Sequence, residues 1–510
     1  MTEQGTRRRE PAAPGTPTGD RWAALAVLSA CLLLVGMDMT VLNVAVPTLT
    51  RQLLPSRVEL LWILDAYSLA VAATVVSCGT LGDRIGRKRM LLLGFAVFGL
   101  ASTGAAFAPA PQWLIVARVA LGVGAAAITA TAVAVIRVVF TDARERTLAI
   151  GLWSASHSVG AAAGPVLGGL LVEHFWWGSV FLVNVPVVAA AMLLGSRVIP
   201  ESRDPAPRRW DPLSVVLSVA GVGGLVYCLK RLGGYGVETA ASIVGLLAVA
   251  ALVAFVRRQR RLAEPLLNLA LFADRRFSTS VVCVLAAFGT TPAMLFLLTQ
   301  RFQLIEGWSP LTAGLALVPW TAAAGLGGLL APHLARRLGH RVTMTTALGV
   351  FAAAVAAVGL SASTRTVWTE PVLALAGLTL GVAMPLAGDT MMTAAPPERA
   401  GEAAAVQEIS FELGAGLGIV VLGTVASITY RASLPAVPGV PPALRRAAGE
   451  SLAAAADVAA HLPPDRGQAL RTAAGHAFTA GLTNAALLAA LGVAGAAVLC
   501  GLLLTSRGRS

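Results

Sequence analysis

The chain has 510 residues, of which 56% are hydrophobic and only 13% are charged, and its mean hydropathy is +0.74. Soluble domains carry roughly 25% charged residues, so this composition excludes a soluble enzyme, a disordered chain and a disulfide scaffold. The formal charge of +13 is also found in nucleic-acid binders, but the 39 Lys and Arg residues fall mainly in short gaps between apolar runs. We therefore expect a protein that contacts the lipid bilayer and binds no nucleic acid.

Apolar runs of about 20 residues, enough to cross roughly 30 Å of hydrocarbon, recur along the whole chain. The first run is too long for the core of a signal peptide, so we expect a retained first span. The predicted spans are residues 22–46, 58–81, 90–108, 112–136, 146–171, 179–199, 212–232, 239–256, 278–299, 311–334, 342–361, 370–393, 403–427 and 478–504. The sequence thus predicts an all-α membrane protein with fourteen spans.

A repeated loop divides these spans into two halves. Leu81-Gly-Asp-Arg-Ile-Gly-Arg-Lys88 is echoed by Leu334-Ala-Arg-Arg-Leu-Gly-His-Arg341, and each follows the second span of a six-span half. Two parallel six-helix repeats are a transporter architecture. We expect the following parts: a tail at 1–21, a first half at 22–200, two inserted spans with a linker at 201–277, a second half at 278–504 whose outer loop at 428–477 is mobile and short-helical, and a tail at 505–510.

The basic residues predict how the chain is oriented. If the N-terminus is cytoplasmic, the inner gaps hold about 27 of the 39 Lys and Arg residues, and the short outer loops about six. The positive-inside rule then places both termini in the cytoplasm and the protein in the cytoplasmic (inner) membrane. The five cysteines lie in apolar segments without a C-x-x-C pair or a His at metal spacing, so we expect no disulfide, no metal and no cofactor.

Three motifs resemble those of a known family. Gly79-Thr-Leu-Gly-Asp-Arg-Ile-Gly-Arg-Lys88 resembles the cytoplasmic loop signature of the major facilitator superfamily. Met37-Asp-Met-Thr-Val-Leu-Asn-Val-Ala-Val-Pro47 resembles the first-helix motif of its fourteen-helix drug:proton antiporter family. The stretch from 160 to 169 resembles the antiporter motif of exporters, with Gly160, Gly164, Pro165, Gly168 and Gly169 in place. The resemblance implies a major facilitator fold of two six-helix halves with two extra central helices.

The resemblance also implies a function. Trp62-Ile-Leu-Asp-Ala-Tyr-Ser68 and Gln407-Glu-Ile-Ser-Phe-Glu-Leu-Gly414 look most like exporters of quaternary ammonium compounds and cationic dyes. We therefore expect a monomeric, proton-coupled efflux antiporter with an amphipathic small-molecule substrate and no enzymatic activity. No Walker A pattern that would indicate ATP hydrolysis occurs. The alternatives are a proton-coupled exporter of a self-made antibiotic or other natural product, and a membrane-embedded enzyme or sensor, for which no nucleophile cluster is found.

Ionisable residues inside predicted spans are the candidate site residues, because such a group in hydrocarbon costs about 3 kcal/mol or more. Those we select for proton coupling or cation binding are Asp38, Asp65, Arg118, Glu408 and Glu412. The first three should lie at comparable depth in the outer half, and the alternative is a purely structural pair of Arg118 with Asp38 or Asp65. Glu408 and Glu412 are one helical turn apart and should share a face. The alternative is that Glu412 bonds a neighbouring helix while Glu408 lies at the water-exposed end. The resemblance favours Glu408 as the cation site.

Two further motifs predict conformational roles. Asp83, Arg84, Gly86 and Arg87 form a candidate latch, because Asp83 can pair with a nearby arginine or with a helix terminus of the other half. The alternative is a basic turn that only sets topology. The glycines of the antiporter motif recur every four residues and so line one helix face, on which another helix can approach closely. This seam either serves packing alone or also seals the cavity against proton leak.

The number of acids in the spans predicts the preferred charge of the substrate. Residues 311 to 330 contain no acid, and Ala324 stands where family members noted for dications carry a carboxylate. An unpaired acid in a dry cavity is costly, so a transporter should hold only as many acids as its cargo and protons neutralise. We therefore expect a preference for monovalent lipophilic cations.

Overall fold

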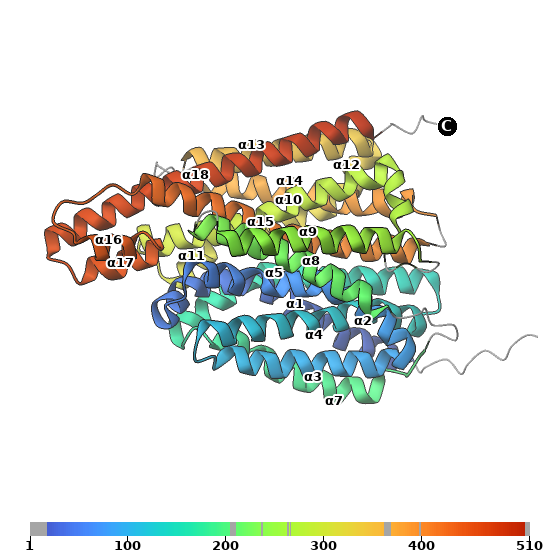
Figure 1. Ribbon diagram of the computed structural model, residues 1–510. Helices are drawn as coiled ribbons and strands as arrows, with labels where there is room; N and C mark the ends of the chain where they lie inside the picture. The colour runs from blue at the N-terminus through green and yellow to red at the C-terminus, as the bar shows by residue number, and fades with distance from the viewer. Residues whose placement is uncertain are drawn as a thin grey trace, which may run out of the picture.

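The computed structural model describes residues 18–203, 211–235, 238–262, 265, 267–361, 369–396 and 399–504. Most of both predicted tails and part of the linker between the halves lie outside these residues. Within them the long helices stand side by side in one bundle (Figure 1). Fourteen helices of the described part are long and apolar enough to cross a membrane. The prediction of an all-α, multi-pass membrane protein is confirmed.

The N-terminal half is built from six spans. Its helices are α1 (Thr18–Leu53), α2 (Arg57–Ile85), α3 (Arg87–Ala106), α4 (Pro111–Val139), α5 (Ala143–His174), and α6 (Ser179–Leu182) with α7 (Asn184–Val198), which together make the sixth span. Helix α1 packs on α5, and α4 lies between α2 and α3. Glycines of α4 explain these close contacts: a Cβ at Gly122 would lie 2.4 Å from the Tyr67 carbonyl oxygen of α2, and one at Gly124 would lie 2.8 Å from the Phe98 nitrogen of α3.

The C-terminal half repeats this plan. Its spans are α10 (Arg275–Gln300) with a π-helical end (Arg301–Ile305), α11 (Pro310–Leu315) with α12 (Val318–Leu338), α13 (His340–Leu360), α14 (Thr369–Ala394), α15 (Ala400–Ser433) and α18 (Pro464–Leu503). A short 3-10 helix, Leu269–Ala273, precedes α10. The echoed loops also agree in geometry, since Gly86 between α2 and α3 has φ 114° and Gly339 between α12 and α13 has φ 85°. Both glycines adopt a backbone conformation that side chains with a Cβ disfavour.

The two inserted spans, α8 (Pro212–Tyr235) and α9 (Thr239–Gln259), form an antiparallel pair. In Figure 1 this green pair runs between the N-terminal helices and the red and orange C-terminal ones. At one end of the pair, Arg258 donates to both carboxylate oxygens of Asp211, at 2.9 and 3.0 Å. Helix α8 contacts α2 of the first half and α15 of the second. The inserted pair therefore covers a place where the two halves meet.

The predicted outer loop is shorter than expected. Helix α18 begins at Pro464 and α15 continues to Ser433, because polar or alanine-rich turns extend both helices beyond their apolar spans, and a proline suits the first turn of a helix. Between them lie the expected short helices, α16 (Pro442–Ala448) and α17 (Leu452–Ala460). The Tyr430 hydroxyl donates to the Ala448 carbonyl at 2.9 Å and ties this hairpin to α15.

Polar contacts join the two halves at the end of the bundle that carries this hairpin. The Gln303 amide donates to the Val44 carbonyl at 2.9 Å. The Ser309 hydroxyl donates to the Glu173 carboxylate, also at 2.9 Å. The halves are therefore in contact at the end that carries the α16–α17 hairpin.

Candidate functional site

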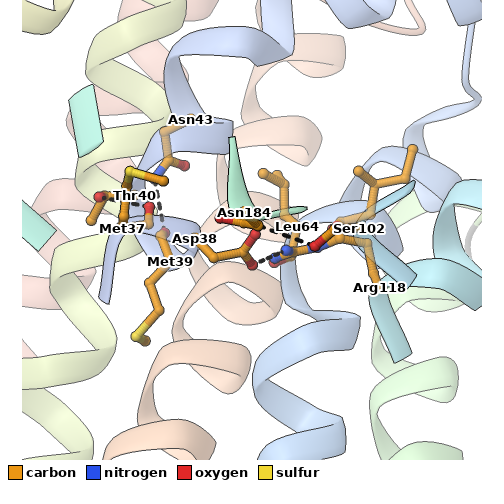
Figure 2. A network of polar contacts seen from close by, with 10 residues as sticks. Met37, Asp38, Met39, Thr40, Asn43, Leu64, Ser102, Arg118 and Asn184 are labelled. Atoms are coloured by element: carbon orange, nitrogen blue, oxygen red, sulfur yellow. Dashed lines mark hydrogen bonds and ion pairs between the residues drawn. The ribbon is translucent and has the colours of Figure 1, made fainter. Parts of the chain in front are cut away.

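A buried ion pair connects α1 and α4. Arg118 and Asp38 are 2% and 0% exposed, and the Arg118 Nη1 donates to Asp38 Oδ2. Figure 2 shows the two side chains reaching toward each other. The Arg118 Nε donates in addition to the Ile63 carbonyl of α2 at 3.0 Å. Of the two partners considered for Arg118, the structure pairs it with Asp38, and the arginine fastens α2 to the same pair.

The next turn of α2 links this pair to α15 in the other half. The Tyr67 ring lies under the Arg118 guanidinium, with 4.8 Å from Cζ to the ring centroid. Ser68 lies within side-chain hydrogen-bonding range of the Glu412 carboxylate. One turn of α2 therefore faces the first ion pair on one side and an acid of the C-terminal half on the other.

Several buried polar atoms around this turn have no hydrogen-bond partner among the described residues: Asp38 Oδ1, the Tyr67 hydroxyl and Glu412 Oε2. All three side chains are at most 4% exposed. Buried polar atoms normally make hydrogen bonds, and a buried donor or acceptor left without one costs about 1 to 3 kcal/mol. The arrangement can therefore accept protons, water or a polar ligand without first breaking a hydrogen bond.

The two glutamates of α15 lie in different surroundings. Glu412 is buried against α2, whereas Glu408, one turn nearer the start of the helix, is partly exposed. The neighbouring Phe411 packs edge-on against Phe288 of α10, with 4.9 Å between ring centroids. This geometry agrees with the interpretation in which Glu412 engages a neighbouring helix, and it leaves Glu408 the more accessible carboxylate.

Asp65 pairs with a residue that the sequence analysis did not select. The Lys230 Nζ of α8 donates to Asp65 Oδ1 at 2.6 Å, and both side chains are 0% exposed. A pair of Asp65 with Arg118, one of the predicted alternatives, is therefore not present. Lys230 lies inside the predicted span 212–232, and a signal was available: Asp38 and Asp65 are two acids that were expected at comparable depth, and only one base, Arg118, was selected to pair with them. Counting charges would have indicated that a second base was missing.

The residues of the candidate latch lie at the junction of α2 and α3 and make their contacts on the N-terminal side of the chain. The Arg87 guanidinium binds Asp83, with 2.9 Å from Nη2 and 3.0 Å from Nε to Oδ1. Gly86 is closely covered, since a Cβ there would lie 2.5 Å from Glu201 Oε1. Arg84 is exposed. In this conformation the candidate latch is closed on its own half.

The antiporter motif has two faces. Toward α1, a Cβ at Gly160 would lie 1.9 Å from the Leu33 carbonyl oxygen, one at Gly164 would lie 2.0 Å from Thr40 Oγ1, and one at Gly168 would lie 2.8 Å from a Val41 methyl carbon. Toward α11, a Cβ at Gly169 would lie 2.6 Å from the Leu311 Cα. A Cβ at Gly314 of α11 would in turn lie 2.1 Å from the Pro165 carbonyl oxygen. The motif therefore packs α5 against its own half and against the other half.

Comparisons with known proteins agree with this architecture. Residues 28–419 match the model of the Major Facilitator Superfamily. The chain is 38% identical over 495 residues to the multidrug efflux pump LfrA of Mycolicibacterium smegmatis, covering 96% of this chain and 98% of that protein. It is also 38% identical over 463 residues to the methyl viologen resistance protein SmvA of Salmonella typhimurium, covering 90% and 93%.

A solved structure has the same fold. It is a bacterial homolog of the human lysosomal transporter Spinster, in an inward-facing and occupied conformation, with a TM-score of 0.67 and 18% identity over 96% of this chain and 97% of that chain. The fourteen candidate spans fit the fourteen-helix drug:proton antiporter family. The chain belongs to the Major Facilitator Superfamily and is a membrane transporter, not an enzyme.

Proposed function

We propose that this protein is a proton-coupled efflux antiporter that exports lipophilic cationic drugs, dyes or antiseptics across the cytoplasmic membrane. One observation carries the proposal: buried acids of both halves meet at one turn of α2, and Asp38 and Glu412 each keep an oxygen without a partner among the described residues. The names of two relatives, a multidrug efflux pump and a methyl viologen resistance protein, support a cationic cargo.

Antiport follows when a proton and a cation compete for the same carboxylates. Protonation of Asp38 removes the charge that holds Arg118, so the arginine keeps its α2 carbonyl but loses α1. A bound cation instead stabilises the ionised acids nearby. Each ligand therefore lowers the affinity for the other, and this coupling is reciprocal.

The glycine motif provides a mechanical link for this exchange. Because α5 packs closely on both α1 and α11, a shift of α1 at Asp38 changes the contact between the halves. We assign the seam a sealing role as well as a packing role. Asp83, Arg84, Gly86 and Arg87 then act as a latch that leaves its own half for the other half in the opposite conformation.

Orientation and oligomeric state are part of the proposal. Both termini lie in the cytoplasm, as the basic loops predict, and the working unit is a monomer. A cysteine introduced into the α16–α17 hairpin of a cysteine-free variant should react with an impermeant maleimide added from outside. Light scattering of the purified protein should give the mass of one chain, 52.1 kDa, after subtraction of detergent.

Everted membrane vesicles test the coupled transport. With an acid interior, addition of tetraphenylphosphonium should dissipate part of the pH gradient in wild-type vesicles. Asp38→Asn should abolish this response, whereas Asp465→Asn, the same acid-to-amide change at an exposed position of α18, should retain it. An unchanged response in Asp38→Asn would contradict the coupling. A response only to anionic or neutral natural products would favour the alternative substrate class.

A further inference from the structure

Trp62 and Asp65 of α2 form a small cluster with Lys230 of α8. The lysine Nζ lies 2.6 Å from Asp65 Oδ1 and 3.5 Å from the centroid of the Trp62 ring. Trp62 and Asp65 are three residues apart on one helix and therefore share a face. The ammonium thus lies between a carboxylate and the face of an indole.

This combination of groups is the chemistry that recognises an organic cation. An indole face attracts a cation within about 6 Å of its centroid, most strongly when water is excluded. The surrounding side chains are apolar: Leu69, Val226 and Val420 are buried there, with Leu229 and Val222 packed against them. Asp65 Oδ2 has no hydrogen-bond partner among the described residues, so the carboxylate retains an unused acceptor.

We propose that Trp62 and Asp65 form a binding site for a lipophilic monocation, and that Lys230 is a tethered cation which fills this site until α8 moves. The inference deepens the proposed export of cations and rests on it. In this conformation the lysine occupies the place that the positive group of a substrate would take.

Charge balance makes the exchange necessary. An ionised carboxylate that is fully buried needs a partner, and removing one member of a buried pair costs about 3 to 5 kcal/mol. Asp65 is therefore neutralised at every stage by the lysine, by a substrate cation or by a proton.

The position of α8 makes the exchange possible. Helix α8 contacts α2 and α15, which belong to opposite halves. Movement of one half relative to the other must therefore shift Lys230 relative to Asp65, unless α8 follows α2 completely. The turn that carries Trp62 is itself fixed by the bond from Arg118 Nε to the Ile63 carbonyl, so the acceptor side of the site stays in place.

A simpler role would be a tether that only fastens the inserted helices to α2. The two roles differ in what happens when the lysine is removed. A tether predicts weaker folding and no new affinity for cations. A tethered competitor predicts tighter binding, because the apparent affinity of a site rises when the fraction of free sites rises.

The experiment measures binding of radiolabelled tetraphenylphosphonium to purified protein in detergent, without a gradient. If the lysine leaves about one site in ten free, Lys230→Met should bind about tenfold more tightly than wild type. Adding Asp65→Asn or Trp62→Leu to Lys230→Met should remove this gain in affinity. Arg231→Met, which removes the adjacent cation of α8, is the matched control and should not tighten binding.

The outcomes separate this inference from the proposed function. Affinity in Lys230→Met that is unchanged or lower, or a gain that persists without Asp65, would overturn the tethered competitor. If Lys230→Met does not accumulate, the charge-neutral variant Lys230→Met with Asp65→Asn decides: affinity at or below the wild-type value supports a site that needs Asp65, and binding tighter than wild type overturns it. Absence of binding in both wild type and Lys230→Met would instead refute the export of lipophilic cations.

Discussion

The α1–α5 seam gives a prediction whose size follows from the structure. In Gly160→Ala the new Cβ would lie 1.9 Å from the Leu33 carbonyl oxygen, whereas ordinary contact begins at 3.4 Å, so the helices must separate by about 1.5 Å there. Backbone cannot rotate away as a side chain does. Overpacking of this kind costs typically 1 to 3 kcal/mol, and we expect about 3 kcal/mol because both groups belong to rigid helices.

A second glycine of α5 supplies the control. Gly151 is exposed, and a Cβ there would meet no atom within 4 Å. Alanine is favoured over glycine in a helix by roughly 0.5 to 1 kcal/mol at both positions. The difference in unfolding free energy between Gly160→Ala and Gly151→Ala therefore isolates the steric cost of placing a methyl group between α1 and α5.

The assay combines thermal unfolding in detergent with ethidium efflux from cells. Gly160→Ala should unfold several degrees below Gly151→Ala and lose most efflux. Gly151→Ala should match wild type in efflux and unfold at the wild-type temperature or slightly above it, because alanine is favoured in a helix. Equal melting temperatures and equal efflux in the two variants would refute the close approach of α1 and α5. A normal melting temperature with a proton leak in Gly160→Ala vesicles would assign the seam to sealing alone.

Four further predictions concern charged groups. Asp38→Asn should reach the membrane but lose gradient-driven efflux, because Arg118 remains buried without its carboxylate; vesicle transport measures this, and retained efflux would contradict it. Asp83→Asn should bind tetraphenylphosphonium normally in detergent but fail to transport it, and an equal loss of both would count against a latch. Resistance assays should show stronger protection against monovalent quaternary ammonium compounds than against dications such as methyl viologen. Equal or stronger protection against the dications would show that the absence of an acid from residues 311 to 330 does not matter. Hydrogen bonds from Arg258 hold the pKa of Asp211 at about 2, below its ordinary 3.8. The pair therefore stabilises this end of the α8–α9 hairpin fully above pH 3.8, and the stabilisation is lost as the pH falls through 2. Limited proteolysis of the hairpin end as a function of pH, with Asp211→Asn as reference, measures this loss.

The spans were predictable because each needs only a sufficient length of apolar sequence. Their ends were less so. Hydropathy marks where a helix leaves the hydrocarbon, whereas the helix itself continues until a cap or a breaker stops it. Helix α18 begins at Pro464, well before the predicted apolar run at 478–504, because no proline interrupts the intervening turns, and alanines outnumber their two glycines.

The ion pairs were predictable only in part, since pairing depends on which helices become neighbours. Depth along the helices correctly brought Asp38 and Arg118 to the same level. Depth did not reveal that α8 returns to lie against α2, so Arg118 was the partner considered for Asp65, and Lys230 was overlooked. A buried base in an inserted helix is itself evidence for such a contact, because the base must find an acid.

One segment of α2 now connects all of these charges. Between Trp62 and Ser68 it touches Lys230 of α8, Arg118 of α4 and Glu412 of α15, and through Arg118 it reaches Asp38 of α1. A rigid helix cannot satisfy three charged neighbours independently, so neutralising any one acid changes the balance at the other two. The proposed coupling can therefore act through this turn of helix as well as through competition of a proton and a cation for one carboxylate. They need only act on the same turn of helix, and a double-mutant cycle between Asp38 and Lys230 should then show non-additive effects on cation affinity although the two side chains belong to different ion pairs.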